Sequence, residues 1–185
     1  MMRIWKALPV IVSVLIATAL CAQNTAATQK FSDEKTGYSL LYPKGFKVKK
    51  TKTGAEITSK DKALVVTVKV YNGNDLAAIA KKESKPTADS LDVLNSVLAE
   101  LGVIKELDRS LNSLPDSILE PAKAESGSII KYDLKKKNAR FVCRSLVFAR
   151  GEKMVAISYT ISEKKGNEKY EKTAADILRS FAFTE

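Results

Sequence analysis

The chain contains no histidine, and this absence excludes more chemistry than any other feature of its composition. Ser-His-Asp and Cys-His nucleophilic systems need an imidazole base, so neither kind of site is available. Zinc sites built from histidine and cysteine are excluded as well, because the 185 residues include only two cysteines. The sequence has no phosphate-binding glycine loop of the P-loop or dinucleotide type. We therefore predict a non-enzymatic protein with no catalytic residue, no metal site and no cofactor.

Paired carboxylates are the one catalytic chemistry that this composition leaves open. The visible pairs are Asp33 with Glu34 and Asp116 with Glu120. Adjacent side chains of an extended chain point apart, so the first pair predicts a solvated turn. Glycosidase carboxylates come from distant positions of a sequence. A carboxylate-only hydrolase is therefore kept as an alternative function.

The first 22 residues have the composition of an export signal. Arg3 and Lys6 precede an uncharged run of small and apolar residues over positions 7–20. The 14 residues of this run suit a signal h-region and fall short of the ~20 that span a bilayer. We predict a signal peptide over residues 1–22, cut after the small residue Ala22. The mature protein is then exported, to the periplasm or the extracellular space.

Lipidation at Cys21 is the alternative to simple cleavage, and it would anchor the protein to a membrane as a lipoprotein. Bacterial lipidation signals usually have a small residue before the cysteine, whereas this chain has Leu20. We therefore favour cleavage after Ala22. That cut removes two of the ten net positive charges and leaves Cys143 as the only cysteine. The apolar neighbours of Cys143 predict a small buried side chain.

The remaining sequence predicts a short polar leader over residues 23–30 and a single domain over residues 31–185. Residues 63–71 form the strongest strand pattern, and they are largely apolar on both faces, which is typical of a covered central strand. Two helices follow, over residues 76–82 and from a cap at Thr87 to a stop at Gly102. A last helix is predicted over residues 167–181.

Further strands lie before and after the two central helices. Residues 128–134, 139–149 and 154–161 are joined by tight turns and predict antiparallel pairing. Residues 103–107 predict a strand, and residues 111–121, with two prolines, a loop. The order of elements predicts an α+β protein, with an antiparallel sheet of about six to seven strands and helices on both faces.

The chain resembles the PsbP-like superfamily, named for an extrinsic subunit of plant photosystem II. The family opens with a Gly-aromatic-Ser strand, a Tyr-Pro pair and a Gly-Trp pair, and closes with a helix ending in Ser-Phe. The corresponding residues here are Gly37-Tyr38-Ser39, Tyr42-Pro43, Gly45-Phe46 and Ser180-Phe181. The strand pair around Tyr132 and Phe141, followed by the Arg150-Gly151 turn, fits in order and spacing.

The resemblance implies an α/β/α sandwich and an accessory role without catalysis. The chain departs from the pattern at Phe46, where the family often has tryptophan. Since histidine is absent, no histidine-dependent ion or partner site of photosynthetic members carries over. The N-terminal segment resembles a bacterial secretory signal rather than a transit peptide, so a photosystem role is not implied.

Positive charge is the remaining signal, because lysine and arginine gather along two predicted hairpins. Such clusters are common on solvated faces and protect edge strands, and they also suit docking of an anionic partner. The predicted anionic-partner surface consists of Lys47, Lys49, Lys52, Lys135, Lys136, Lys137 and Arg140. The candidate partners are an acidic envelope protein, a polysaccharide or a lipid surface. Nucleic acid is not expected for an exported protein without interleaved basic and aromatic residues.

Overall fold

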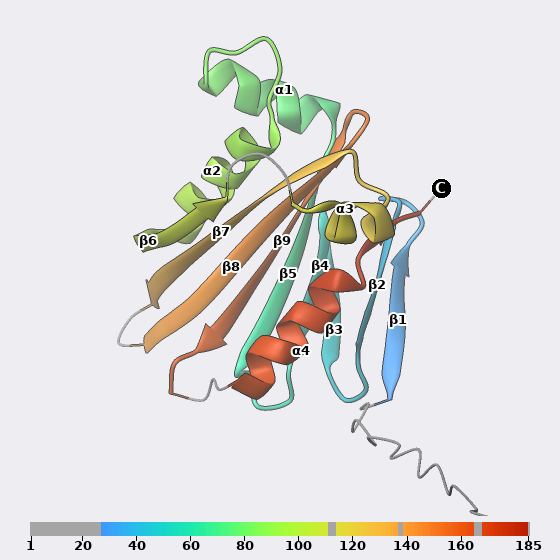
Figure 1. Cartoon of the computed structure of the whole chain (residues 1–185), viewed down its shortest axis with the longest axis vertical. Coiled ribbons are helices and arrows are strands. Elements are labelled where there is room, and N and C mark those ends of the chain that lie inside the picture. Colours follow the sequence, from blue (N-terminus) through green and yellow to red (C-terminus); the bar gives the residue numbers. More distant parts are fainter. Residues whose placement is uncertain (1–26, 111–113, 137–138, 165–167, 185) are drawn as a thin grey trace, which may run out of the picture.

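A seven-stranded antiparallel sheet is the framework of the molecule (Figure 1). The computed structural model describes residues 27–110, 114–136, 139–164 and 168–184. The predicted α+β class and the predicted number of strands are confirmed. From one edge to the other, the strands are β3 (Lys47–Thr51), β4 (Gly54–Thr58), β5 (Leu64–Tyr71), β9 (Lys153–Ser162), β8 (Ala139–Arg150), β7 (Ser126–Lys136) and β6 (Val103–Ser110).

A second sheet of three strands lies beside the β3 edge (Figure 1). It consists of β1 (Thr28–Asp33), β2 (Tyr38–Pro43) and the short β10 (Ala182–Phe183). The sequence predicted a single sheet, so the separate pairing of β2 is a correction. β1 pairs with β2 along its whole length, and it therefore begins three residues before the predicted domain start at residue 31.

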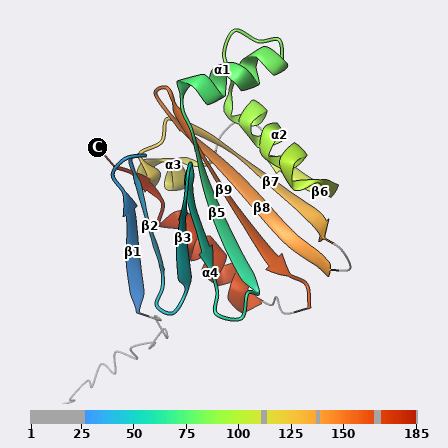
Figure 2. The same ribbon diagram turned by 180° about the vertical axis from the view of Figure 1, so that it is seen from behind.

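Helices cover both faces of the large sheet, as predicted. α1 (Gly73–Lys82) and α2 (Ser90–Leu101) lie on one face, which Figure 2 shows from the front. α3 (Asp116–Ala122) and α4 (Glu168–Arg179) lie on the opposite face (Figure 1). We refer to these two faces as the α2 face and the α4 face.

The two faces bury separate cores because the side chains of a strand alternate between them. β5 lies between β4 and β9, and its α4-face residues Leu64, Val66, Val68 and Val70 are at most 8% exposed. On the α2 face of the same strand, Val65, Thr67 and Lys69 are only half-buried. The prediction of a central strand is confirmed, but the prediction of full cover on both sides is wrong.

The end of α4 joins the two sheets. The Ser180 hydroxyl accepts a hydrogen bond of 2.8 Å from the Leu41 backbone N–H of β2. The Phe181 ring stacks on Phe148 of the large sheet at 4.9 Å between centroids, and it also contacts Tyr38 at 5.9 Å. The Ser-Phe ending of the predicted helix therefore has a structural role in the core.

Three local predictions are wrong. α3 occupies part of the predicted loop at residues 111–121, because Pro115 is acceptable at a helix entry and Pro121 falls in the last turn. The cap of α2 is Asp89 rather than Thr87, and its carboxylate accepts from the Leu91 and Asp92 N–H groups. β10 was not predicted. By contrast, Gly102 ends α2 at a φ of 68°, as predicted.

The predicted signal peptide, Cys21 and the cleavage site at Ala22 lie outside the described residues, as does the first half of the predicted leader. None of the helices that the structure describes is long and apolar enough to cross a membrane.

Candidate functional site

The lysines of β3 are divided between the two faces of the sheet. Lys47 and Lys49 are exposed on the α2 face, and Lys49 is directly opposite Glu56 of β4. Lys50 lies on the α4 face and donates to the Asp33 carboxylate of β1 at 2.9 Å. Acidic groups therefore neutralise part of the cluster that appears uniformly basic in the sequence.

Asp33 is an unusual member of this edge because its side chain is only 2% exposed. Burial opposes its ionisation, but the hydrogen bonds from Lys50 and Thr36 and the charge of Lys50 outweigh burial and lower its pKa. The Asp33–Lys50 pair thus fixes β3 against β1.

The second basic cluster lies on β7 and β8 and pairs like charges with each other, although Asp133 lies between its two lysines and Asp108 of β6 is opposite Lys131. Lys131 is directly opposite Arg144, and Lys135 is directly opposite Arg140. Opposed residues of antiparallel strands have Cβ atoms about 4.5–5.5 Å apart, and like charges at that separation destabilise the sheet. None of these four residues forms an ion pair with another described residue. We call these four residues the basic face.

The basic face lies on the part of the α4 face that no helix covers. α4 packs on β5 and β9, and in Figure 1 no helix lies in front of the lower parts of β7 and β8. Lys131, Lys135 and Arg140 are exposed, whereas Arg144 is half-buried over the Tyr159 ring, 5.8 Å from its centroid. The Nε of Arg144 is buried without a hydrogen-bond partner in the described part of the chain.

Not every predicted surface residue belongs to these two clusters. Lys52 lies in the β3–β4 turn and lines a cavity there, at the end of β3. The side chain of Lys136 and all of Lys137 lie outside what the structure describes. The predicted surface therefore does not form one continuous patch, because β3 and β8 are separated by β4, β5 and β9.

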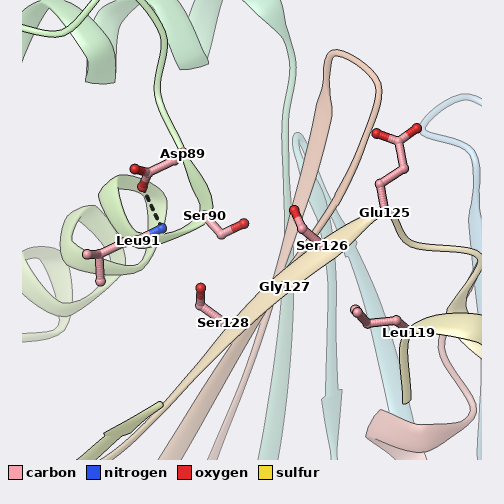
Figure 3. A pocket seen from close by; sticks show the side chains of 8 residues that line it. All are labelled: Asp89, Ser90, Leu91, Leu119, Glu125, Ser126, Gly127 and Ser128. Atoms are coloured by element: carbon pink, nitrogen blue, oxygen red, sulfur yellow. Dashed lines mark hydrogen bonds between the residues drawn. The ribbon is translucent and has the colours of Figure 1, made fainter. Parts of the chain in front are cut away.

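A cavity of about 370 Å³ between α2 and β7 contains carboxylates, and it bears on the hydrolase alternative (Figure 3). Asp89 caps α2 and also accepts from Lys85 at 3.3 Å. Burial acts against ionisation of Asp89, but its hydrogen bonds prevail and lower the pKa. Glu125 is exposed and accepts from the Gly151 N–H at 3.1 Å. A general acid needs a raised pKa, so Asp89 does not suit that role.

The carboxylates that the sequence offered as pairs do not face one another across a cavity. Asp116 and Glu120 are exposed on α3, and Asp33 is bound to Lys50 whereas Glu34 is exposed. Among the residues described, no three His, Cys, Asp or Glu side chains come together as metal ligands. Cys143 is 1% exposed within the α2-face core, as predicted for a small buried side chain.

Another cavity, about 690 Å³ in volume, lies at the lower end of the molecule beside the β2–β3 turn. Asp61 lines this cavity, and its carboxylate accepts hydrogen bonds from the Tyr170 and Ser59 hydroxyls at 2.6 Å and 2.7 Å. These hydrogen bonds, that from Tyr170 being the strongest, lower the pKa of Asp61 to about 2. The network ties α4 to the β4–β5 turn. No local sequence pattern indicated this network, since residues 61 and 170 meet only in the folded chain.

The fold and the site together define a three-layer α+β domain that carries a basic face and has no recognised catalytic arrangement among its described residues. The chain has the PsbP-like fold. It matches cyanobacterial PsbP from Synechocystis sp. PCC 6803 with a TM-score of 0.55 and 16% identity, over 85% of this chain and 93% of that one.

The Ran-binding protein Mog1p of Saccharomyces cerevisiae has a similar fold. It matches with a TM-score of 0.53 and 9% identity, over 87% of this chain and 97% of that one. No protein-family model and no curated protein matches the sequence. At these identities the likeness concerns the fold alone.

Proposed function

We propose that this protein is an exported, non-enzymatic accessory protein of the cell envelope, and that its basic face docks an acidic protein. The observation that carries the proposal is the direct opposition of Lys131 to Arg144 and of Lys135 to Arg140 on an uncovered part of the sheet. This arrangement disfavours the isolated protein. Carboxylates of a partner that lies over β7 and β8 would attract these lysines and arginines and offset their mutual repulsion.

The two arginines favour a protein partner. A guanidinium binds a carboxylate through two parallel hydrogen bonds, and arginine is enriched in protein interfaces whereas lysine is depleted there. Next to this face, the edge strand β6 exposes Ile104 and Leu107 at 51% and 48%, which adds apolar contact area.

Fold analogy gives weaker support, because a fold hosts many functions. Mog1p, which shares the fold, is a Ran-binding protein, so the same framework binds another protein in that case. Export is supported by the positive charges at Arg3 and Lys6 and by the apolar run at 7–20.

The docking proposal is tested by recovery of partners from the envelope fraction at low and at moderate salt. The wild-type protein is compared with a Lys135→Gln/Arg140→Gln variant. The matched control is Lys44→Gln/Lys47→Gln, which removes the same charge at the other edge of the sheet. We expect an acidic protein to be recovered with the wild type and the control, and to be lost with the first variant.

Two results would overturn the proposal. One is the same recovery with both variants, which would mean that net charge or another surface, rather than the basic face, determines binding. The other is sedimentation of the purified protein with vesicles of anionic phospholipid, abolished by the first variant, without any protein recovered. That result would make a lipid surface the partner.

Export and anchoring are decided by the mass of the protein isolated from its host. Cleavage after Ala22 gives an unmodified chain beginning at Gln23, which is the result we expect. A chain beginning at an acylated Cys21 would establish the lipoprotein instead, and an intact N-terminus would contradict export by cleavage.

A further inference from the structure

Four turns meet around a cavity of about 390 Å³ at the end of the sheet opposite the Asp61 network. They are the β1–β2 turn, the β3–β4 turn, the segment from β5 into α1 and the start of β9. Three lysines that are far apart in the sequence come together there. The lining residues are Lys35, Thr36, Lys52, Thr53, Val70, Asn72, Asp75 and Lys153.

Lys153 is the fixed member of the three lysines. Its Nζ is half-buried and donates a hydrogen bond of 2.8 Å to the Thr36 carbonyl oxygen. Gly37 leaves the room that this ammonium needs, because a Cβ on Gly37 would lie 2.9 Å from the Nζ. The φ of +75° at Gly37 also favours glycine. Gly37, in the turn between β1 and β2, therefore helps to hold Lys153 of β9 in place.

The cavity has an excess of positive charge. No described carboxylate lies within ion-pair distance of Lys35, Lys52 or Lys153. Asp75 is the only acid of the lining, and its carboxylate accepts from the Asn72 N–H at 3.2 Å in the first turn of α1. Three lysines against one aspartate leave an excess of two positive charges. A concave site lined by one sign of charge raises the local concentration of counter-ions.

We propose that this cavity binds a phosphate monoester, a site separate from the basic face. Phosphate monoesters carry a charge of about −1.5 to −2 at pH 7, which matches the excess of two. Lysine is a common phosphate ligand and acts as a point charge with three donors, and Lys153 uses one donor on Thr36. The Thr53 hydroxyl and the N-terminus of α1 add donors at the rim.

The size of the cavity sets the kind of ester. A volume of about 390 Å³ lies near the lower end of the range for small-molecule sites, about 300–1,000 Å³, and exceeds what an inorganic phosphate fills. The ester therefore carries a small organic group, either free in solution or as the headgroup of a phospholipid.

The test is calorimetric titration of the purified protein with glycerol phosphate and with inorganic phosphate. We expect saturable binding to one site, tighter for the ester. Lys153→Gln and Lys52→Gln should each weaken it at least tenfold, because each removes a charge-assisted hydrogen bond. The control Lys44→Gln removes the same charge at the opposite end of the sheet and should bind as the wild type does. Lys52→Gln is informative even if Lys153→Gln fails to fold, since Lys52 is exposed and forms no ion pair with a described residue.

Vesicles of phosphatidic acid separate the two sources of the ester. Tighter binding to these vesicles than to glycerol phosphate assigns the site to a lipid headgroup, and the reverse assigns it to a free ester. Absence of saturable binding to both, or equal weakening by Lys44→Gln, overturns the proposal. Its failure is distinguishable from failure of the docking proposal, because Lys135→Gln/Arg140→Gln leaves the cavity lining intact.

Discussion

The two lysine clusters look alike in the sequence and differ in the folded protein. On β3, Lys49 is opposite Glu56 and Lys50 binds Asp33, so the cluster is partly neutralised by neighbouring strands. On β7 and β8, lysine is opposite arginine in two pairs of the same face, which the Asp133–Val142 pair separates. The first arrangement is typical of a protected sheet edge. The second disfavours folding slightly and is therefore the better candidate for a site with a function.

Low pH should give the largest effect, because it protonates Asp33 beside β3 and also the hydrogen-bonded carboxylates Asp61 and Asp89 elsewhere in the fold. The pKa values of Asp33, Asp61 and Asp89 are lowered in the folded protein, so the unfolded chain binds more protons as the pH falls. Stability should therefore decline from about pH 4, near the pKa of an unfolded aspartate, to about pH 2, where Asp61 titrates.

Denaturant unfolding at a series of pH values measures this decline. The chain has no histidine, so we expect an almost constant free energy of unfolding between about pH 5 and 8. A marked change within that interval would contradict this assignment of the titrating groups.

Replacement of Asp33 by asparagine isolates one acid of the β3 side. The change removes the buried carboxylate that accepts from Lys50, whose own side chain is exposed, and it should lower the free energy of unfolding by about 1–2 kcal/mol. Guanidinium unfolding at pH 7 measures it. Lys47→Gln, which removes an exposed charge without an ion pair among the described residues, should change stability by no more than about 0.5 kcal/mol. Equal effects of the two variants would show that the Asp33–Lys50 pair contributes nothing specific.

The smallest expected changes in stability compare the two clusters most directly. Replacement of lysine by glutamate should destabilise the protein at one cluster and stabilise it at the other. Lys49→Glu places two acids opposite each other at Glu56 and should destabilise the protein by about 0.2–1 kcal/mol. Lys135→Glu places an acid opposite Arg140 and should stabilise it by a similar amount. Both shifts should shrink in high salt, which screens exposed charges. Shifts of the same sign would mean that net charge, and not cross-strand pairing, controls stability.

Much of the framework could be predicted from the sequence, since local patterns determine local structure. The alternation of buried and partly exposed residues predicts the strand β5, and Gly102 predicts the end of α2, each from only a few neighbouring residues. The helix α3 was missed because its prolines obscure a short segment that tertiary packing stabilises through Leu119 and Ala122. β10 was missed because two residues carry no periodic signal, and only pairing with β2 makes them a strand.

The amino-acid sequence alone excludes catalysis and metal binding by histidine, since a chain without histidine lacks an imidazole in every fold. It also determined the fold class, because hydrophobic periodicity reports on nearby residues. Only the tertiary structure decided which lysines are matched by acids, which are opposed by like charges, and which three meet in one cavity. The reason is distance: electrostatic interactions depend on separation in space, and Lys35, Lys52 and Lys153 are close only after the strands have paired.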